Sequence, residues 1–290
     1  MRRVAIILVV AACTKHANVD EAAAANLFDA IVLPDVPPGE SDLTVDDRGK
    51  IWAIAERDRV ASEIELHGLT ATVVAHPIDG VPDGNDTESM AWLGSNQFAL
   101  GMEGQQVATA GVLFAELRPD GHLAVTRTRM LSDDEIGVHL TKNHGAEALC
   151  GTGDRLLVGI EERGTLDDGA RFAPIVRLDG DKVSRARLEL TTGTGKLSAL
   201  DCKFAPDGSV DFVGIERHYG VERVLHGTLP AHAPDGAIIV PTVAVDLAPV
   251  IHDVYNLEGI ARLSDGRTVL INDNQGSHVD GPTKLFVLKR

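Results

Sequence analysis

Carboxylate side chains recur along the 290-residue sequence in five related segments. Each segment ends in an acid, and the series is Glu56, Glu103, Glu162, Glu216 and Asp273. Each also begins with an acid or a serine, and that series is Ser41, Glu88, Glu147, Ser198 and Glu258. Carboxylates that are brought together repel one another and keep their charge only near cations. A cluster of them could hold calcium, which takes about six to eight oxygen ligands.

The spacing between the two members is fifteen residues in four of the five segments. The fourth segment has two possible registers. Asp201 lies fifteen residues before Glu216, whereas Ser198-Ala-Leu is more similar to Ser41-Asp-Leu and implies extra residues at the turn. We take Ser198 as the equivalent of Ser41.

Each segment has the pattern of a β-hairpin. Short apolar runs flank a turn near the middle, as in Asp265-Gly266, and this places both members of a pair at the same end of the hairpin. Two further strand candidates follow most hairpins, for example Ile64–Leu66 and Thr72–Ala75. Four strands repeated in roughly fifty residues predict an all-β fold, a β-propeller of four-stranded antiparallel blades.

Five repeats are visible, so we expect five blades, or six if one has degenerated. The strand candidates at 27–33 and 284–289 have no hairpin of their own, and pairing them would close the ring. A two-sheet sandwich is the alternative, but it would not require a repeated carboxylate spacing. In a propeller the paired positions gather around one mouth of the central channel.

Three interpretations of the channel carboxylates remain open. Arg57, Arg163 and Arg217 each follow a second-series glutamate, so the pairs could form a girdle of salt bridges between blades. The acids could instead hold a metal ion, with Glu147, Glu258 and Asp273 as ligands. The arginines could also hold a phosphate or carboxylate group of a ligand.

His144 is the candidate general base, because it lies in a polar loop three residues before Glu147. A solvated loop histidine is the alternative. The segment from Thr192 to Lys196 is not a P-loop, since Leu197 replaces the required Ser or Thr. No GxSxG nucleophile motif occurs.

The composition excludes some classes of partner. The formal net charge is −16, which argues against nucleic acid and against an anionic membrane surface. Aromatic residues make up only 4%, so the core must consist of Val, Leu, Ile and Ala. We expect a monomer that binds a small molecule at the channel.

Residues 1–13 are typical of a bacterial lipoprotein signal. Two arginines precede the apolar run 4–12, which is too short to span a bilayer, and small residues precede Cys13. We expect lipidation at Cys13, a tether over 14–25, a propeller over 26–290, and attachment to the cell envelope only through the lipid. An ordinary signal peptide or an apolar first strand is the alternative. Cys150 and Cys202 could form a disulfide or remain two buried thiols.

Several of these motifs together resemble the phytase-like propeller family, which is described as having esterase-like activity. The resemblance covers residues 39–290, and its motifs are Leu257-Glu-Gly-Ile-Ala, Leu270-Ile-Asn-Asp-Asn, Leu157-Val-Gly-Ile-Glu-Glu-Arg163, Ser198-Ala-Leu with Pro206-Asp-Gly208, and Glu216-Arg217. A weaker similarity, through Glu258 and Asn272-Asp273, is to the gluconolactonase-like propellers, which hold a divalent metal.

The resemblance implies an exported propeller, with phosphoester hydrolysis and calcium as expected properties. Our leading hypothesis is a metal-dependent phosphoesterase in which Arg163 and Arg217 pair with phosphate oxygens. The sequence departs from the pattern where Ser41 and Ser198 replace acids and where Gly104 and Asn274 interrupt the Glu-Arg repeat. The alternative is a propeller that binds a ligand or partner without catalysis.

Overall fold

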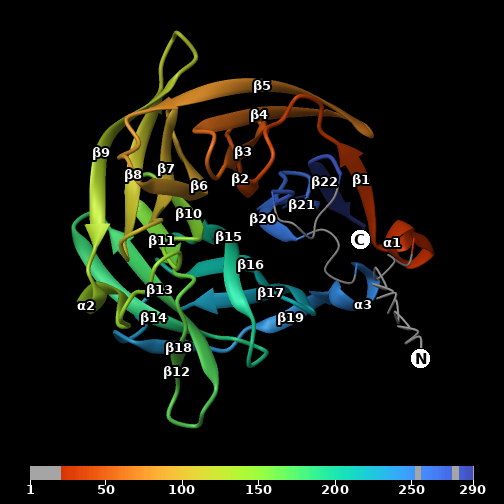
Figure 1. Ribbon diagram of the computed structural model, residues 1–290. Coiled ribbons are helices and arrows are strands. Elements are labelled where there is room, and N and C mark those ends of the chain that lie inside the picture. The colour runs from red at the N-terminus through yellow and green to blue at the C-terminus, as the bar shows by residue number, and fades with distance from the viewer. Residues whose placement is uncertain (1–20, 252–255, 276–280, 290) are drawn as a thin grey trace, which may run out of the picture.

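The computed structural model describes residues 21–251, 256–275 and 281–289 and shows five β-blades arranged in a ring (Figure 1). The expected signal, including Cys13, lies outside these residues, and residues 21–25 of the expected tether belong to helix α1. No helix within the described residues is both long enough and apolar enough to cross a membrane.

Successive hairpins build the blades. The first blade contains β2 (Glu40–Val45), β3 (Ile51–Ala55), β4 (Val60–His67) and β5 (Thr70–Asp79). The second contains β6 (Asn85–Gly94), β7 (Gln97–Gly104), β8 (Ala110–Leu117) and β9 (Leu123–Leu131). The third contains β10 (Ala148–Thr152), β11 (Arg155–Gly159), β13 (Arg171–Asp179) and β14 (Lys182–Glu189), with β12 (Gly164–Thr165) beside β13.

The fourth blade contains β15 (Lys196–Phe204), β16 (Val210–His218), β17 (Val221–Leu229) and β19 (Thr242–Asp246). The fifth contains β20 (Leu257–Arg262), β21 (Thr268–Asn272), β22 (Lys284–Leu288) and β1 (Phe28–Val32). Short elements complete the fold: α1 (Glu21–Leu27), α2 (Asp133–Ile136), α3 (Ala248–Ile251) and β18 (Ala237–Ile239), which runs parallel to β14. The propeller prediction is therefore confirmed, with five blades in the described ranges and no sandwich.

The ring closes through the pairing of its first and last strands. β1 runs antiparallel to β22, from Phe28 opposite Leu288 to Val32 opposite Lys284. Phe28 also packs edge-on against Phe286, with ring centroids 5.0 Å apart. The expected pairing of 27–33 with 284–289 is thus confirmed, and it removes an exposed sheet edge from the fifth blade.

Apolar side chains fill all five interfaces between neighbouring blades. The interface between the first and second blades, for example, contains Trp52 and Phe98, with ring centroids 4.8 Å apart. Elsewhere Val, Leu, Ile and Ala predominate, as the low aromatic content predicts. Because each blade is buried on both faces, its strands contain nearly continuous apolar runs.

The innermost strands β2, β6, β10, β15 and β20 contact one another in order around the ring. Side chains rather than ladder bonds connect them. The buried carboxylate of Asp42 on β2 accepts hydrogen bonds from the backbone N–H groups of Leu43 (2.8 Å), Met90 on β6 (3.0 Å) and Ile260 on β20. Ser89 on β6 donates to the carbonyl of Ala146, just before β10 (2.7 Å). These hydrogen bonds fix the positions of the innermost strands relative to one another along the axis of the ring.

A disulfide joins two neighbouring innermost strands. Cys150 on β10 and Cys202 on β15 are bonded, and their Cα atoms are 5.6 Å apart. This resolves the two alternatives that the sequence leaves open. The bond ties the third blade to the fourth beside their shared apolar interface.

We predict that replacing both cysteines, Cys150→Ala with Cys202→Ala, lowers the free energy of unfolding by about 2–4 kcal/mol, because the bond closes a long loop in the unfolded chain. Alanine avoids placing a hydroxyl in the apolar interface. Urea unfolding monitored by circular dichroism measures the change. Reductant should shift the wild-type midpoint and leave that of the double variant unchanged; equal midpoints without reductant would contradict the prediction.

Candidate functional site

β-Bulges place the first series of residues at the inner ring. The ladder between the two inner strands is interrupted at Ser41, Glu88, Ser198 and Glu258, one in each of four blades. A bulged residue leaves the ladder and its side chain is redirected. In the third blade, Glu147 stands directly before β10. Ser198 is therefore the equivalent of Ser41, as expected, whereas Asp201 pairs with Val213 inside the ladder.

The second series differs from the expected register in two blades. Glu56, Glu103 and Asp273 lie two residues beyond the ladder pairs 42–54, 89–101 and 259–271. The same count from pairs 148–159 and 199–215 leads to Glu161 and Arg217. The hairpin of the third blade is one residue shorter than that of the first, so the spacing of fifteen selects Glu162 instead of its neighbour Glu161. In the fourth blade the spacing of fifteen, counted from Asp201, selects Glu216 instead of Arg217.

Glu162 and Glu216 brace loops instead of joining the channel carboxylates. Glu162 accepts from the hydroxyl of Thr141 (2.5 Å) and from its N–H (3.2 Å). Glu216 accepts from the N–H and hydroxyl groups of Thr191 and Thr192, at 2.5 to 3.0 Å. Their assignment as channel carboxylates is corrected accordingly.

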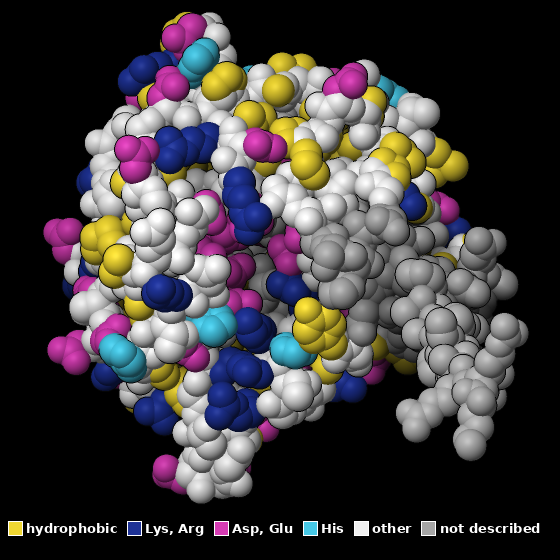
Figure 2. Space-filling model, in the orientation of Figure 1, with side chains coloured by type: hydrophobic (Ala, Val, Ile, Leu, Met, Phe, Trp, Pro, Cys, Tyr) yellow, Lys and Arg dark blue, Asp and Glu magenta, His cyan; other side chains and the backbone are white. Residues whose placement is uncertain are grey.

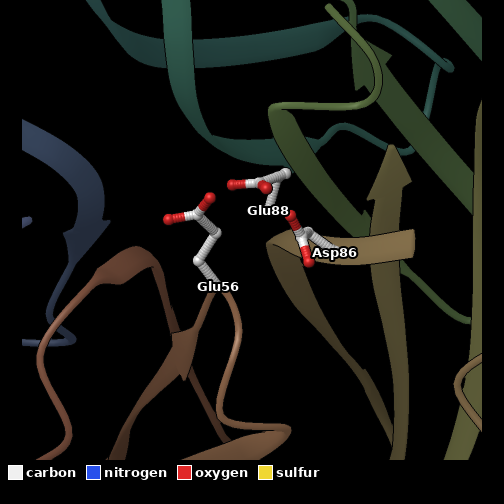
Figure 3. A group of neighbouring side chains, drawn as sticks. All are labelled: Glu56, Asp86 and Glu88. Carbon is white, nitrogen blue, oxygen red and sulfur yellow. The ribbon is translucent and has the colours of Figure 1, made fainter. Parts of the chain in front are cut away.

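The mouth of the ring is a hollow in which acidic side chains meet Lys and Arg side chains (Figure 2). On the acidic side, Glu56, Asp86 and Glu88 converge, with one oxygen of each within 4.8 Å of the others (Figure 3). Glu88 is only 4% exposed, and its Oε1 has no hydrogen-bond partner among the described residues. This acidic triad has the oxygen donors and the unsatisfied atom that a metal site requires.

Asp86 was not among the candidate ligands, because it has no counterpart in the repeated series. It ends the polar segment 83–86 and pairs with Glu103 across the ladder of the second blade. The amide of Gln105 donates to both of its oxygens, at 2.7 and 2.8 Å. The loop composition was the only indication in the sequence.

Burial dominates the electrostatics of the acidic side. It raises the pKa of Glu258 to about 8 and that of Glu103 to about 7. Burial, and then neighbouring carboxylates, hold the pKa values of Glu88 and Glu147 well above the ordinary range. Without a cation, several of these acids therefore retain protons at neutral pH.

The three expected metal ligands do not form the converging group. Asn256 donates to both Glu258 and Asp273, at 3.0 Å each, and Arg217 forms a 2.5 Å ion pair with Glu258. Glu147 forms a hydrogen bond with Glu103. These acids adjoin the acidic triad, and the negative charges of Glu103 and Glu258 contribute to the raised pKa of Glu88.

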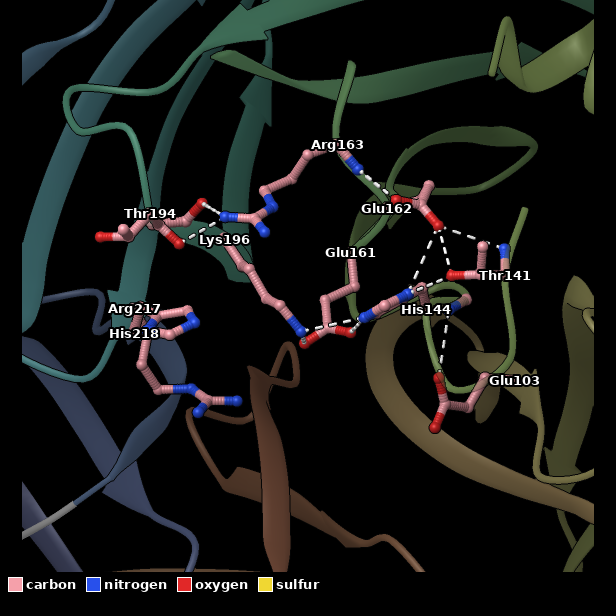
Figure 4. Close-up of polar contacts among 12 residues, drawn as sticks. Glu103, Thr141, His144, Glu161, Glu162, Arg163, Thr194, Lys196, Arg217 and His218 are labelled. Atoms are coloured by element: carbon pink, nitrogen blue, oxygen red, sulfur yellow. Dashed lines mark hydrogen bonds and ion pairs between the residues drawn. The ribbon is translucent and has the colours of Figure 1, made fainter. Parts of the chain in front are cut away.

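Cationic side chains gather at the inner end of the fourth blade (Figure 4). Lys196 contacts Glu161 at 2.8 Å, and Arg217 reaches across to Glu258 of the fifth blade. Arg163 donates to the carbonyl of Thr194 at 2.6 Å. Burial, followed by the charges of Lys196, Arg163 and Arg217, lowers the pKa of His218, which sequence reasoning had not singled out.

A repeated Glu-Arg girdle is not found in the part of the chain that the structure describes. Arg57 pairs with its own neighbour Glu56 at 2.7 Å, and of the three arginines expected to form the girdle only Arg217 bonds to a carboxylate of the next blade. Arg163 bonds to carbonyl oxygens and, through its backbone N–H, to Glu162.

Both ring nitrogens of His144 are engaged. Nδ1 contacts the hydroxyl of Thr141, and Nε2 lies 3.1 Å from the ammonium of Lys196. The ring sits between Glu161 and Glu162, at 3.4 and 3.3 Å. His144 therefore links Lys196 to the acids of the third blade (Figure 4).

Comparison with a solved structure agrees with the fold. The allergen Mala s 1 from Malassezia sympodialis has a TM-score of 0.54 at 9% identity, with 90% of this chain and 96% of that chain covered. The PQQ-bound aldose sugar dehydrogenase from Streptomyces coelicolor has a TM-score of 0.48 at 11% identity, with 90% and 98% covered. At 9% identity the similarity to Mala s 1 concerns the fold alone. No curated protein matches the sequence.

A family model named Phytase-like, described as "esterase-like activity of phytase", matches residues 38–276. The match covers most of the chain and all five inner hairpins, and it ends shortly after β21. The chain therefore belongs to the Phytase-like family of β-propellers.

Proposed function

We propose that the mouth binds a divalent cation, namely calcium, and hydrolyses a small phosphate ester. The observation that carries this proposal is the meeting of opposite charges at one mouth (Figure 2). The charge of Glu258 acts on Glu88 of the acidic triad, and Glu258 is itself paired with Arg217 of the fourth blade. Carboxylate oxygens suit a hard cation, and the unpartnered Oε1 of Glu88 supports a ligand there. Bound calcium would supply Lewis-acid activation of water and phosphate.

The chain's own residues would then orient the ester and handle its protons. Arg163 and Arg217 pair with phosphate oxygens, as charge-assisted hydrogen bonds favour. Glu103, with a pKa of about 7, is matched to general-base work at neutral pH. His144 holds Lys196 and Glu161 in place, since both of its nitrogens are already engaged.

We also propose that the protein is exported, anchored through Cys13, and monomeric. The disulfide between Cys150 and Cys202 supports an oxidising compartment. The second candidate function is ligand binding without catalysis, which is favoured by the engagement of His144 and by the serines at two ring positions.

We predict that the wild-type protein binds one calcium ion per chain and that Glu88→Gln weakens binding about tenfold or more, because a buried charged ligand is lost. Calorimetric titration measures the affinity, and phosphate release from phytate and simple phosphate esters, with and without chelator, measures activity. Glu116→Gln, the same change at an exposed position on the second blade, is the control and should match wild type. Absence of calcium binding to wild type would refute the metal site, and binding without any turnover would favour the non-catalytic alternative.

We predict that, without calcium, the melting temperature falls by on the order of 5–10 °C between pH 5 and pH 8. Glu103 and Glu258 have an ordinary pKa of 4.5 but values of about 7 and about 8 when folded. Between 4.5 and 8 the folded chain therefore binds more protons than the unfolded chain, so stability decreases as pH rises; below 4.5 both states are protonated. Scanning calorimetry in chelator measures the trend.

Calcium should reverse part of this loss, because it binds the ionised carboxylates of the acidic triad. The stabilisation by calcium should therefore increase from pH 5 to pH 8. A melting temperature that rises over this interval in chelator would show that the buried acids are already ionised, against the expectation.

A further inference from the structure

We infer that the fourth blade carries a binding site for a tetrahedral oxyanion, a phosphate or sulfate group, built by Lys196, Ser198 and Arg217. This site does not require the cation of the proposed function. The site consists of hydrogen-bond donors from one hairpin, with Arg163 and His218 at its rim. Such a site could bind an anion in a hydrolase or in a binding protein without catalytic activity.

The ladder register brings the two cations together. Lys196 on β15 is directly opposite Arg217 on β16, and the charges of both act on His218, although Lys196 contacts Glu161 of the third blade and Arg217 contacts Glu258 of the fifth. Like charges in such a pair destabilise a sheet unless an anion lies between or beside them. Glu161 and Glu258 offset one charge each. Arg217 stands where each of the other four blades has an acid, and Lys196 lies opposite it; these two cations mark the fourth blade as the place for an anionic ligand.

Two buried donors at this place lack a partner among the described residues: Ser198 Oγ and Arg217 Nε. Ser198 is only 2% exposed, and its bulge sets it in the inner ring. Leaving such groups unpaired costs free energy, which a ligand acceptor would recover. Ser41 occupies the same bulge position in the first blade, but its hydroxyl contacts the carbonyl of Gly39 at 3.4 Å.

The rim of the site adds two more donors. Arg163 and His218 lie beside Lys196 and Arg217 (Figure 4). The Nδ1 atom of His218 accepts from the backbone N–H of Tyr219 at 2.8 Å, so in the neutral ring the proton is on Nε2. His218 can thus donate a hydrogen bond without adding a further charge.

The geometry of the donors favours a tetrahedral group over a carboxylate. The two terminal nitrogens of Arg217 already bond to Asn256 (2.9 Å) and Glu258 (2.5 Å), so its fork is not free for bidentate pairing with a carboxylate. What remains are three separate donors: an ammonium, a hydroxyl and the Nε–H. Separate donors from two strands can each take a different oxygen of a phosphate or sulfate group.

The test is calorimetric titration of the calcium-free protein, kept in chelator, with inorganic phosphate, sulfate and acetate. We expect wild type to bind phosphate or sulfate, and Ser198→Ala to bind about tenfold more weakly without losing thermal stability, since the lost hydroxyl has no partner in the fold. Ser41→Ala is the matched control and should bind as wild type does. Lys196→Met should weaken binding more than Ser198→Ala.

Three results would overturn the site: no binding of either anion to wild type, equal affinities for Ser198→Ala and Ser41→Ala, or acetate binding as tightly as phosphate. If phosphate binds only after calcium is added, the anion belongs to the metal; this overturns the site and leaves the proposed function standing. If phosphate binds in chelator and no ester is ever hydrolysed, the site stands and the proposed function fails.

Discussion

The buried carboxylate of Asp42 is the junction on which the ring depends. The innermost strands of different blades do not pair with one another, so their inward N–H groups have no ladder partners, and buried groups of this kind must be satisfied elsewhere. Asp42 accepts from its own blade and from the blades on either side. Burial raises the pKa of Asp42 well above its ordinary value, because the charged form loses its solvation there, and the backbone hydrogen bonds oppose this effect. These bonds thereby hold the bulges of the three blades, which lie one or two residues away along the strands, at the same position along the axis of the ring.

The shared position of the bulge residues explains the distribution of charges at the mouth. Five equivalent positions from five blades must share a small space, and identical acids at all of them would repel too strongly to fold without cations. The chain relieves this in three ways: serines at Ser41 and Ser198, protons retained by buried acids such as Glu258, and a cation at Arg217. The result is a mouth whose acidic and basic halves come from different blades, although all blades share one pattern.

The sequence was sufficient for the fold because each blade is buried on both faces, which makes apolar runs and glycine turns regular. It was also sufficient for the first series, since the bulge residues are the repeated ones. The sequence did not predict Glu161 and Arg217 as members of the second series, because the length of the turn changes the number of residues between the two series. It also did not predict Asp86, which has no counterpart in other blades. The sequence drew attention to Lys196 only through the segment 192–196, which lacks the P-loop motif. Its pairing with Arg217 across the ladder could not be predicted, because the two residues are distant in sequence. The pairing of Cys150 with Cys202 likewise depends on which blades are neighbours.

The closure of the ring by β1 and β22 has a kinetic consequence. It joins segments from the two ends of the propeller domain, whereas every other strand of the five blades can pair with a strand made shortly before or after it. Closing so long a loop costs more entropy than forming a hairpin, so it is expected late in folding. Until then β22, whose outer edge β1 covers in the finished fifth blade, presents an unpaired edge. A nascent chain would need protection at that edge against association with its own copies.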